Sequence, residues 1–286
     1  MGNTMRVAAV QLSSGNDVRA NVDRALELIE HAANEGATYV QVPEYFNYLG
    51  SVRRYREVAE SIPGPTTELF AELARRRGIT VHLGSMIEVS PVPERYYNTS
   101  VVIGPDARVC ATYRKIHLFD IDVPGEVVHR ESDALVAGDA LVLAGLDGAV
   151  LGLSICFDLR FPELYRRLAR AGAQILAVPS AFTAHTGRAH WAVLVRARAI
   201  ENHAFVVAAA QVGATAEGVA TYGHSMIVDP WGEVLAESTS DGPDVLVRDI
   251  DLDQVARRRA QIDVLALARD DLYAARVAGP ASPGLC

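Results

Sequence analysis

Cysteine is scarce in this 286-residue sequence: Cys110, Cys156 and Cys286 are the only three, and no two form a CxxC pair. This odd count argues against a disulfide framework and against a thiolate zinc site, and it fits a reducing compartment. Long apolar runs are also missing, because no stretch reaches the roughly 18 uninterrupted apolar residues that a membrane span needs. The sequence therefore predicts a protein without disulfides and without a membrane as partner.

Basic runs are short as well. None exceeds three arginines, and 27 basic against 35 acidic residues give a formal charge of −8, so nucleic acid is not expected as a partner. The first apolar run ends at Gln11, which indicates a strand rather than a signal peptide. Arg6 occupies the position where myristoylation requires Ser or Thr. We therefore expect a cytoplasmic protein.

The composition is typical of a globular protein, with 50% hydrophobic and 22% charged residues. Length alone allows two average domains or one large α/β unit. Strand-like and helix-like segments alternate along the whole chain, and no repeat or linker interrupts them. This pattern favours a single α/β domain over residues 1–275, followed by a loose tail over residues 276–286.

The alternation is read from hydrophobic periodicity and from turn residues. Pro65 and Pro162 open helical segments, and Gly36, Gly78 and Gly172 end them. Residues 116–146 are rich in Asp, Gly and Pro, so an irregular segment with a functional role is expected there. The expected helices are 18–33, 65–77, 162–171, 188–203 and 253–269. The expected strands are 5–12, 38–42, 79–85, 98–103, 107–113, 150–156, 173–179, 204–211, 226–229, 233–237 and 245–250.

Three reactive residues lie at or just after the carboxyl ends of predicted strands: Glu44, Lys115 and Cys156. Ligands of open α/β sheets collect outside the carboxyl ends of strands, so the fold can assemble these residues although they lie far apart in sequence. Cys156 also precedes a helix, where backbone N–H groups of a turn favour a thiolate. Each residue has an ordinary alternative: a buried thiol, a carboxylate in a loop salt bridge, and an exposed charge at a strand end.

Together the three residues make a coherent reactive set. A carboxylate beside a thiol can act as general base, and an ammonium can stabilise both a thiolate and a developing oxyanion. A cysteine nucleophile then forms a thioester, expels ammonia or an amine, and is released by water. This chemistry requires no metal and no organic cofactor.

The order of several motifs resembles the nitrilase superfamily of carbon–nitrogen hydrolases, from Val7 to about Tyr273. Within it, the chain is similar to the Nit branch, which contains ω-amidase and deaminated glutathione amidase. The motifs that carry the resemblance are PEYFN (43–47), YRKIHLFDIDVPG (113–125), GLSICFDLRFPEL (152–164), PSAF (179–182), TG (186–187), AHW (189–191), RARAIEN (196–202), GHS (223–225) and DPWG (229–232).

The resemblance implies a role for several residues. Glu44 matches the family's general base, Lys115 its oxyanion-stabilising lysine, and Cys156 its nucleophile. Glu131 matches a second active-site glutamate that positions substrate and base. The backbone N–H of Phe157 would complete the oxyanion hole.

The resemblance also implies substrate-binding residues. Arg160 matches a position that binds the substrate carboxylate, and a planar guanidinium suits such bidentate binding. A salt bridge from Arg160 to Asp158 or to Glu163 is the structural alternative. Phe182 and Thr186 match pocket residues that contact the same substrate.

The histidines suggest two other kinds of site, a Cys–His hydrolase or a metal centre. His185 and His190 are five residues apart, which suits a shared helix face poorly, and no HExxH motif exists. We therefore interpret the histidines as structural or hydrogen-bonding residues. Of the cysteines, Cys110 is expected to pack in the interior and Cys286 to lie in the tail.

The resemblance implies a four-layer α-β-β-α sandwich that forms homodimers or higher oligomers. The expected function is an amidase that hydrolyses the terminal carboxamide of a small carboxylate-bearing substrate, either a 2-oxo acid ω-amide or deaminated glutathione. One alternative is an N-carbamoyl amino-acid or β-ureido-acid amidohydrolase. An alternative of another class is a binding or scaffold protein without turnover.

Overall fold

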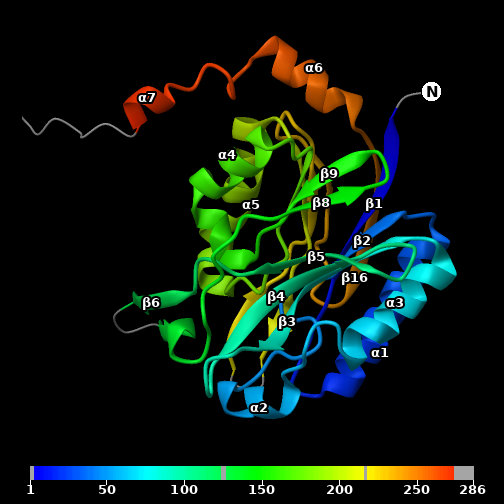
Figure 1. Cartoon of the computed structure of the whole chain (residues 1–286), viewed down its shortest axis with the longest axis vertical. Coiled ribbons are helices and arrows are strands. Elements are labelled where there is room, and N and C mark those ends of the chain that lie inside the picture. The colour runs from blue at the N-terminus through cyan, green and yellow to red at the C-terminus, as the bar shows by residue number, and fades with distance from the viewer. Residues whose placement is uncertain (1–2, 124–126, 216–217, 274–286) are drawn as a thin grey trace, which may run out of the picture.

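The computed structural model describes residues 3–123, 127–215 and 218–273 (Figure 1). Its centre consists of two six-stranded sheets in the orders β16-β1-β2-β3-β4-β5 and β15-β14-β11-β10-β9-β8. The first sheet contains β1 (Thr4–Gln11), β2 (Tyr39–Gln41), β3 (Thr80–Val89), β4 (Tyr96–Ile103), β5 (Val109–Arg114) and β16 (Asp244–Asp251). The second contains β8 (Leu143–Leu146), β9 (Ala149–Gly152), β10 (Ile175–Ala177), β11 (Phe205–Ala208), β14 (Met226–Val228) and β15 (Val234–Glu237).

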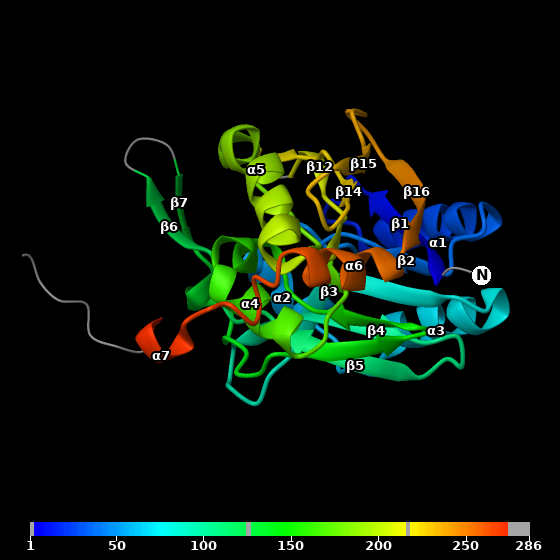
Figure 2. The ribbon, with the colours of Figure 1, turned by 90° about the horizontal axis from the view of Figure 1, so that it is seen from above.

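Helices cover the outer face of each sheet, as Figures 1 and 2 show. The first sheet packs against α1 (Val18–Asn34) and α3 (Pro65–Arg77), and the second against α4 (Pro162–Arg170) and α5 (Ala184–Asn202). The result is the expected α-β-β-α sandwich. The shorter helices are α2 (Tyr55–Val58), α6 (Asp253–Gln261) and α7 (Asp270–Tyr273).

The alternation of side chains along β1 explains the layers. Val7 and Ala9 belong to the core between the two sheets, whereas Ala8 and Val10 belong to the core under α1 and α3. Successive residues of a strand point to opposite faces, so an uninterrupted apolar strand is buried on both sides.

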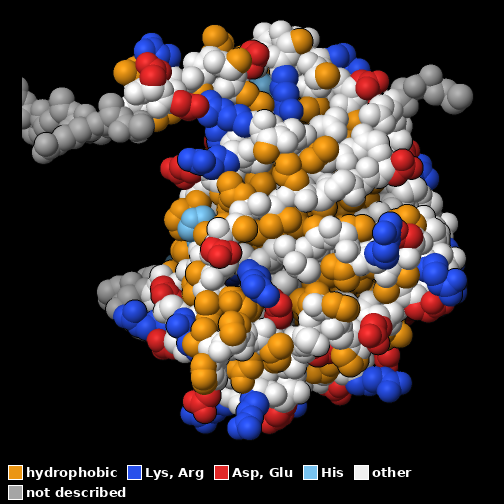
Figure 3. Space-filling view, viewed as in Figure 1, with side chains coloured by type: hydrophobic (Ala, Val, Ile, Leu, Met, Phe, Trp, Pro, Cys, Tyr) orange, Lys and Arg blue, Asp and Glu red, His pale blue; other side chains and the backbone are white. Residues whose placement is uncertain are grey.

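Charged side chains of both signs lie mainly toward the edges of the face in Figure 3, around an apolar middle.

Two small hairpins stand outside the layers. One pairs β6 (Asp120–Val123) with β7 (Val127–Arg130), and the other pairs β12 (Val212–Ala214) with β13 (Ala220–Tyr222). Figure 2 shows β6 and β7 projecting from the layered body. The expectation of an irregular segment over residues 116–146 is therefore wrong in part, because β6, β7 and β8 lie within it.

Three further expectations need correction. Helix α5 begins at Ala184 rather than at residue 188, because the N–H of Gly187 already donates to the carbonyl of Thr183 at 2.8 Å. Helix α6 ends at Gln261 rather than at residue 269, because the Asp263 side chain accepts the N–H of Ala266 and competes with the helix. Cys110 is exposed rather than packed inside.

Cys286 and the expected tail over residues 276–286 lie outside the described residues. Within the described ranges, no helix has both the length and the apolar character needed to cross a membrane.

Candidate active site

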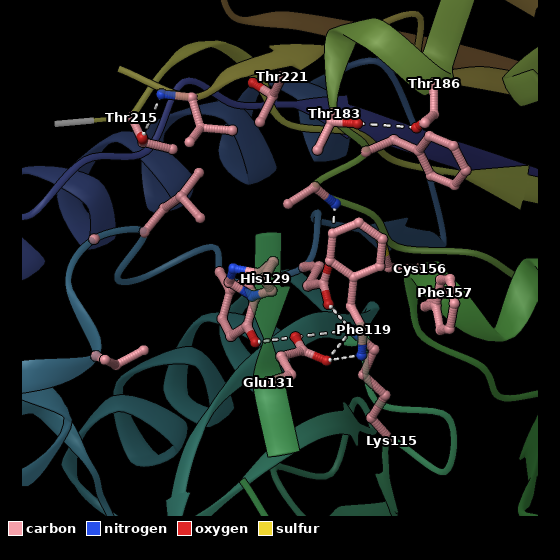
Figure 4. A pocket seen from close by; sticks show the side chains of 18 of the residues that line it. Lys115, Phe119, His129, Glu131, Cys156, Phe157, Thr183, Thr186, Thr215 and Thr221 are labelled. Atoms are coloured by element: carbon pink, nitrogen blue, oxygen red, sulfur yellow. Dashed lines mark hydrogen bonds and ion pairs between the residues drawn. The ribbon is translucent and has the colours of Figure 1, made fainter. Parts of the chain in front are cut away.

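A cavity of about 360 Å³ opens where the ends of the two sheets meet. Residues of the first sheet's connections line one side of it, and residues that follow β9 and β10 line the other. In Figure 4, Lys115 and Glu131 lie on the side opposite the threonines. The lining includes Glu44, Tyr45, Tyr55, Lys115, Phe119, His129, Glu131, Cys156, Phe157, Arg160, Phe182, Thr183, Thr186, Thr215, Val219 and Thr221.

Glu44 lies three residues after the end of β2 and is 1% exposed. Its Oε1 accepts hydrogen bonds from Lys115 Nζ at 2.9 Å and from Asn98 Nδ2 at 3.0 Å. Its Oε2 accepts the backbone N–H of Ala181 at 2.8 Å, across the junction of the two sheets. Tyr45, the next residue, has a φ of +56°, a left-handed conformation that is strained for a tyrosine and turns the chain sharply after the carboxylate.

Lys115 follows β5 and is also 1% exposed. Its Nζ lies 2.9 Å from Glu44 Oε1, and 3.0 and 2.9 Å from Glu131 Oε1 and Oε2. Burial pushes the pKa of Lys115 down, but Glu131 and Glu44 together raise it well above its ordinary value. The lysine therefore carries its charge inside the protein.

Glu131 begins a short 3-10 turn after β7 (Glu131–Asp133) and is buried. Its Oε1 accepts the hydroxyl of Tyr45 at 2.7 Å, and its Oε2 accepts the N–H of Phe119 at 2.7 Å. Burial works to raise the pKa of Glu131, but Lys115 and these hydrogen bonds hold it below the ordinary value. Glu131 thus stays ionised and fixes the lysine from the side opposite Glu44.

Cys156 is the first residue of a 3-10 turn (Cys156–Arg160) and is 8% exposed. Its φ is +47°, a strained left-handed conformation at the junction of strand and turn. Burial and then Glu44 raise the pKa of its thiol well above the ordinary value, although Lys115 opposes them. The expectation that the turn favours a thiolate is therefore wrong, because burial and the neighbouring carboxylate both disfavour the ionised thiol.

Asp158 connects the cysteine turn to the lysine segment. Its Oδ2 accepts the N–H of Ile155 at 2.9 Å and the hydroxyl of Tyr113 at 2.6 Å. Its Oδ1 accepts the N–H of His117 at 3.1 Å and lies 2.7 Å from the Nδ1 of the same ring. These partners directly precede Cys156 and flank Lys115 two residues on either side, so one buried carboxylate sets the position of both reactive groups.

Arg160 lies at the cavity wall with its guanidinium over two aromatic rings. Its Cζ lies 5.8 Å from the Phe157 ring centre and 5.1 Å from that of Phe182, and its Nη1 lies 3.3 Å from His190 Nδ1. Among the described residues it forms no ion pair with a carboxylate, so the alternative salt bridge to Asp158 or Glu163 is not formed. Partial burial lowers its pKa, which makes an anionic ligand favourable there.

Phe182 and Thr186 lie in the same cavity, as the sequence predicts. The Phe182 ring packs on Trp191 with ring centres 5.3 Å apart. Thr186 Oγ1 lies 2.9 Å from Thr183 Oγ1, and Figure 4 shows both threonines on the wall opposite Lys115. All eight predicted site residues therefore line one cavity.

The family model described as carbon-nitrogen hydrolase matches residues 6–260. The chain belongs to this family. It is 40% identical to ω-amidase NIT2 of Homo sapiens over 277 residues, 97% of this chain and 99% of that protein. It is 42% identical to deaminated glutathione amidase of Bos taurus over 93% of this chain and 83% of that protein. The carbon–nitrogen hydrolase class of amidase type, which the sequence predicts, is confirmed.

The crystal structure of the C. elegans NitFhit protein has the same fold. It superposes with a TM-score of 0.86 at 39% identity and covers 96% of this chain. The match spans 66% of that longer protein. The sandwich architecture expected for this carbon–nitrogen hydrolase is thereby confirmed.

Sequence analysis of this hydrolase missed several residues of the site. Tyr45 lies inside the PEYFN motif, and its hydroxyl could have suggested a hydrogen-bonding role in the site. Asn98 gave no such signal, and Asp158, although it lies in the motif over residues 152–164, could be given a role only once the folded sheets brought its partners near it. The residues missed are Tyr45, Asn98, Phe119, Asp158, Thr183 and the N–H of Ala181.

The depressed pKa of Glu131 predicts a pH dependence of stability. Because its folded pKa lies below the unfolded value of 4.5, Glu131 stabilises the fold fully above about pH 4.5, and this contribution is lost as pH falls through the folded pKa. Between pH 5 and pH 3, the free energy of unfolding should therefore fall less in the Glu131→Gln variant than in the parent protein. Urea unfolding at several pH values measures this difference.

Glu68→Gln on the exposed face of α3 is the matched control for this measurement. It should follow the acid dependence of the parent protein. Parallel curves for the parent and Glu131→Gln would contradict the inferred ionisation of Glu131.

Proposed function

We propose that the protein hydrolyses the terminal carboxamide of a small carboxylate-bearing substrate through a thioester on Cys156. The proposal rests on one observation: Glu44, Lys115 and Cys156 line the same cavity. Arg160 lines it too and pairs with no carboxylate among the described residues. The preferred substrates are 2-oxo acid ω-amides or deaminated glutathione, in line with the two curated relatives.

The resting thiol is protonated, so the first step needs a base. Glu44 takes the proton of Cys156 as Sγ attacks the amide carbon, and the carbonyl electron pair moves to oxygen. The ammonium of Lys115 and the N–H of Phe157 stabilise this oxyanion, an effect whose loss typically costs about 10²–10³-fold in rate. Reformation of the carbonyl then breaks the C–N bond.

Protonated Glu44 gives its proton to the leaving nitrogen, and ammonia departs from the thioester. A water molecule then loses a proton to Glu44 and attacks the thioester carbon. As this second tetrahedral intermediate collapses, the C–S bond breaks, Glu44 returns its proton to Sγ, and a carboxylic acid is released. Glu131 takes no proton in this scheme: it holds Lys115 in place and keeps it charged.

Arg160 supplies the contact that selects the substrate. Its guanidinium is partly buried and lies over the rings of Phe157 and Phe182. No carboxylate of the described residues pairs with it, so a substrate carboxylate can take that position. Charge-assisted bidentate pairs of this kind are among the stronger hydrogen bonds in proteins. The cavity of about 360 Å³ has room for both proposed substrate classes.

Arg160→Ala tests the carboxylate contact. The ratio of kcat/KM for glutaramate to that for neutral butyramide should fall about 10–100-fold, since a hydrogen-bonded pair with a charged group contributes about 1.5–3 kcal/mol. Steady-state ammonia release measures both substrates. Arg160→Lys should recover part of the ratio, because it keeps the charge but not the planar fork. An unchanged ratio in Arg160→Ala would rule out this role.

Substrate assays of the wild-type protein distinguish the proposed amidase from the alternative functions. Ammonia release should be compared among 2-oxoglutaramate, N-carbamoyl-β-alanine and a nitrile, and release of the peptide amine cysteinylglycine should be followed for deaminated glutathione. Preference for the carbamoyl acid would favour the amidohydrolase alternative, which needs the same carboxylate contact. Absence of turnover on every compound would favour a binding protein.

A further inference from the structure

His129 lies in the wall of the cavity, two residues before Glu131. It belongs to β7, opposite Ile121 of β6 in the projecting hairpin. Its ring centre lies 5.5 Å from that of Phe119, and Phe119 lies 5.1 Å from Phe157. Figure 4 shows His129 near Glu131, and Cys156 lines the same cavity.

The polar edge of His129 is available to a ligand. The side chain is exposed to the cavity, and within the described ranges no hydrogen bond or ion pair engages it. Six other histidines have polar partners: His31 with Glu35, His82 with Tyr39 and Ser100, His117 with Asp158, His190 with Arg160, His203 with the carbonyl of Pro230, and His224 with Glu237. A neutral imidazole carries one N–H donor, so His129 brings an unused donor to the cavity.

The charged groups near the reacting centre are already engaged. Lys115, Glu44 and Glu131 bind one another, and in the proposed function Arg160 takes the terminal carboxylate. An additional oxygen on the acyl chain, such as a 2-oxo group, would have to be desolvated in the cavity. Without a donor this burial would cost affinity, and His129 is the side chain placed to supply one.

We propose that His129 is a specificity-determining residue that donates a hydrogen bond to a second oxygen on the acyl chain of the substrate. The inference rests on the proposed function and narrows its substrate class to ω-amides that carry a carboxylate and a further carbonyl oxygen. Arg160 then binds the carboxylate, and His129 donates a hydrogen bond to the oxygen that lies between the carboxylate and the scissile amide.

The test compares 2-oxoglutaramate with glutaramate, which lacks the 2-oxo group. His129→Phe keeps a ring against Phe119 but removes the donor. The ratio of kcat/KM for 2-oxoglutaramate to that for glutaramate should fall about 10-fold, mainly through KM, and His129→Gln should restore part of it by supplying an amide N–H. Arg130→Gln is the matched control: Arg130 is the next residue of β7, is exposed and does not line the cavity, so the ratio should not change.

An equal loss on both substrates in His129→Phe would show that the ring only packs on Phe119, and it would overturn the inference. An unchanged ratio would overturn it as well, while leaving the proposed function intact. If the wild-type protein hydrolyses neither compound and does not hydrolyse deaminated glutathione, the proposed function fails and the inference fails with it.

Discussion

Cys156→Ala is expected to lower ammonia release by at least about 10⁴-fold on any substrate that the wild-type protein hydrolyses. Losses of this size follow removal of an attacking atom, because the remaining groups can bind substrate but cannot form the covalent intermediate. Alanine keeps the same Cβ at the strained φ of +47°, so the fold should persist. Single-turnover and steady-state assays with the preferred amide measure the loss.

Cys110→Ala is the matched control, since this exposed cysteine lies on β5 outside the cavity. Its turnover should equal that of the wild-type protein. Mass spectrometry of acid-quenched reactions should find an acyl adduct on Cys156 in the wild type and none in Cys156→Ala. Full turnover in Cys156→Ala would disprove the nucleophile assignment.

Lys115→Met is expected to have the second large effect, on both rate and stability. Methionine has a similar length without charge, so the oxyanion loses a donor and kcat should fall at least about 10³-fold. Glu44 and Glu131 would then face each other, buried and without a cation. Removing one partner of a buried ion pair typically costs about 3–5 kcal/mol, which chemical denaturation can measure.

A double variant separates these two effects. Lys115→Met with Glu131→Gln removes one of the two opposed carboxylates, so part of the lost free energy of unfolding should return. The rate should not return, since the oxyanion donor is still absent. Wild-type stability in Lys115→Met would show that the buried charges are not coupled as their distances of 2.9 and 3.0 Å indicate.

Much of the fold could be predicted from sequence because local signals and tertiary packing agree. The apolar run of β1 indicates a strand buried on both faces. In α1, the N-cap is Asp17, which accepts the N–H of Ala20 at 3.1 Å, and Val22, Ala25 and Ile29 form its buried face. The rule that ligands lie beyond the carboxyl ends of strands found Glu44, Lys115 and Cys156 without knowledge of their distances.

The remaining features depend on long-range contacts that no local pattern encodes. The β6–β7 hairpin brings Phe119 and His129 to the cavity, yet its sequence resembles an irregular loop. The ionisation of Cys156 was mispredicted because the turn was considered without Glu44 and without burial. Asp158 could only be recognised once Tyr113 and Ile155 were seen to share its carboxylate.

The reactive groups come from different sheets, and this has a consequence for the newly made chain. Glu44 and Lys115 follow strands of the first sheet, whereas Cys156 follows a strand of the second. Until the two halves pack together, the thiol has no base beside it and no cation near its target. Packing of the two sheets against each other is therefore required before Cys156 has both its base and its oxyanion donor.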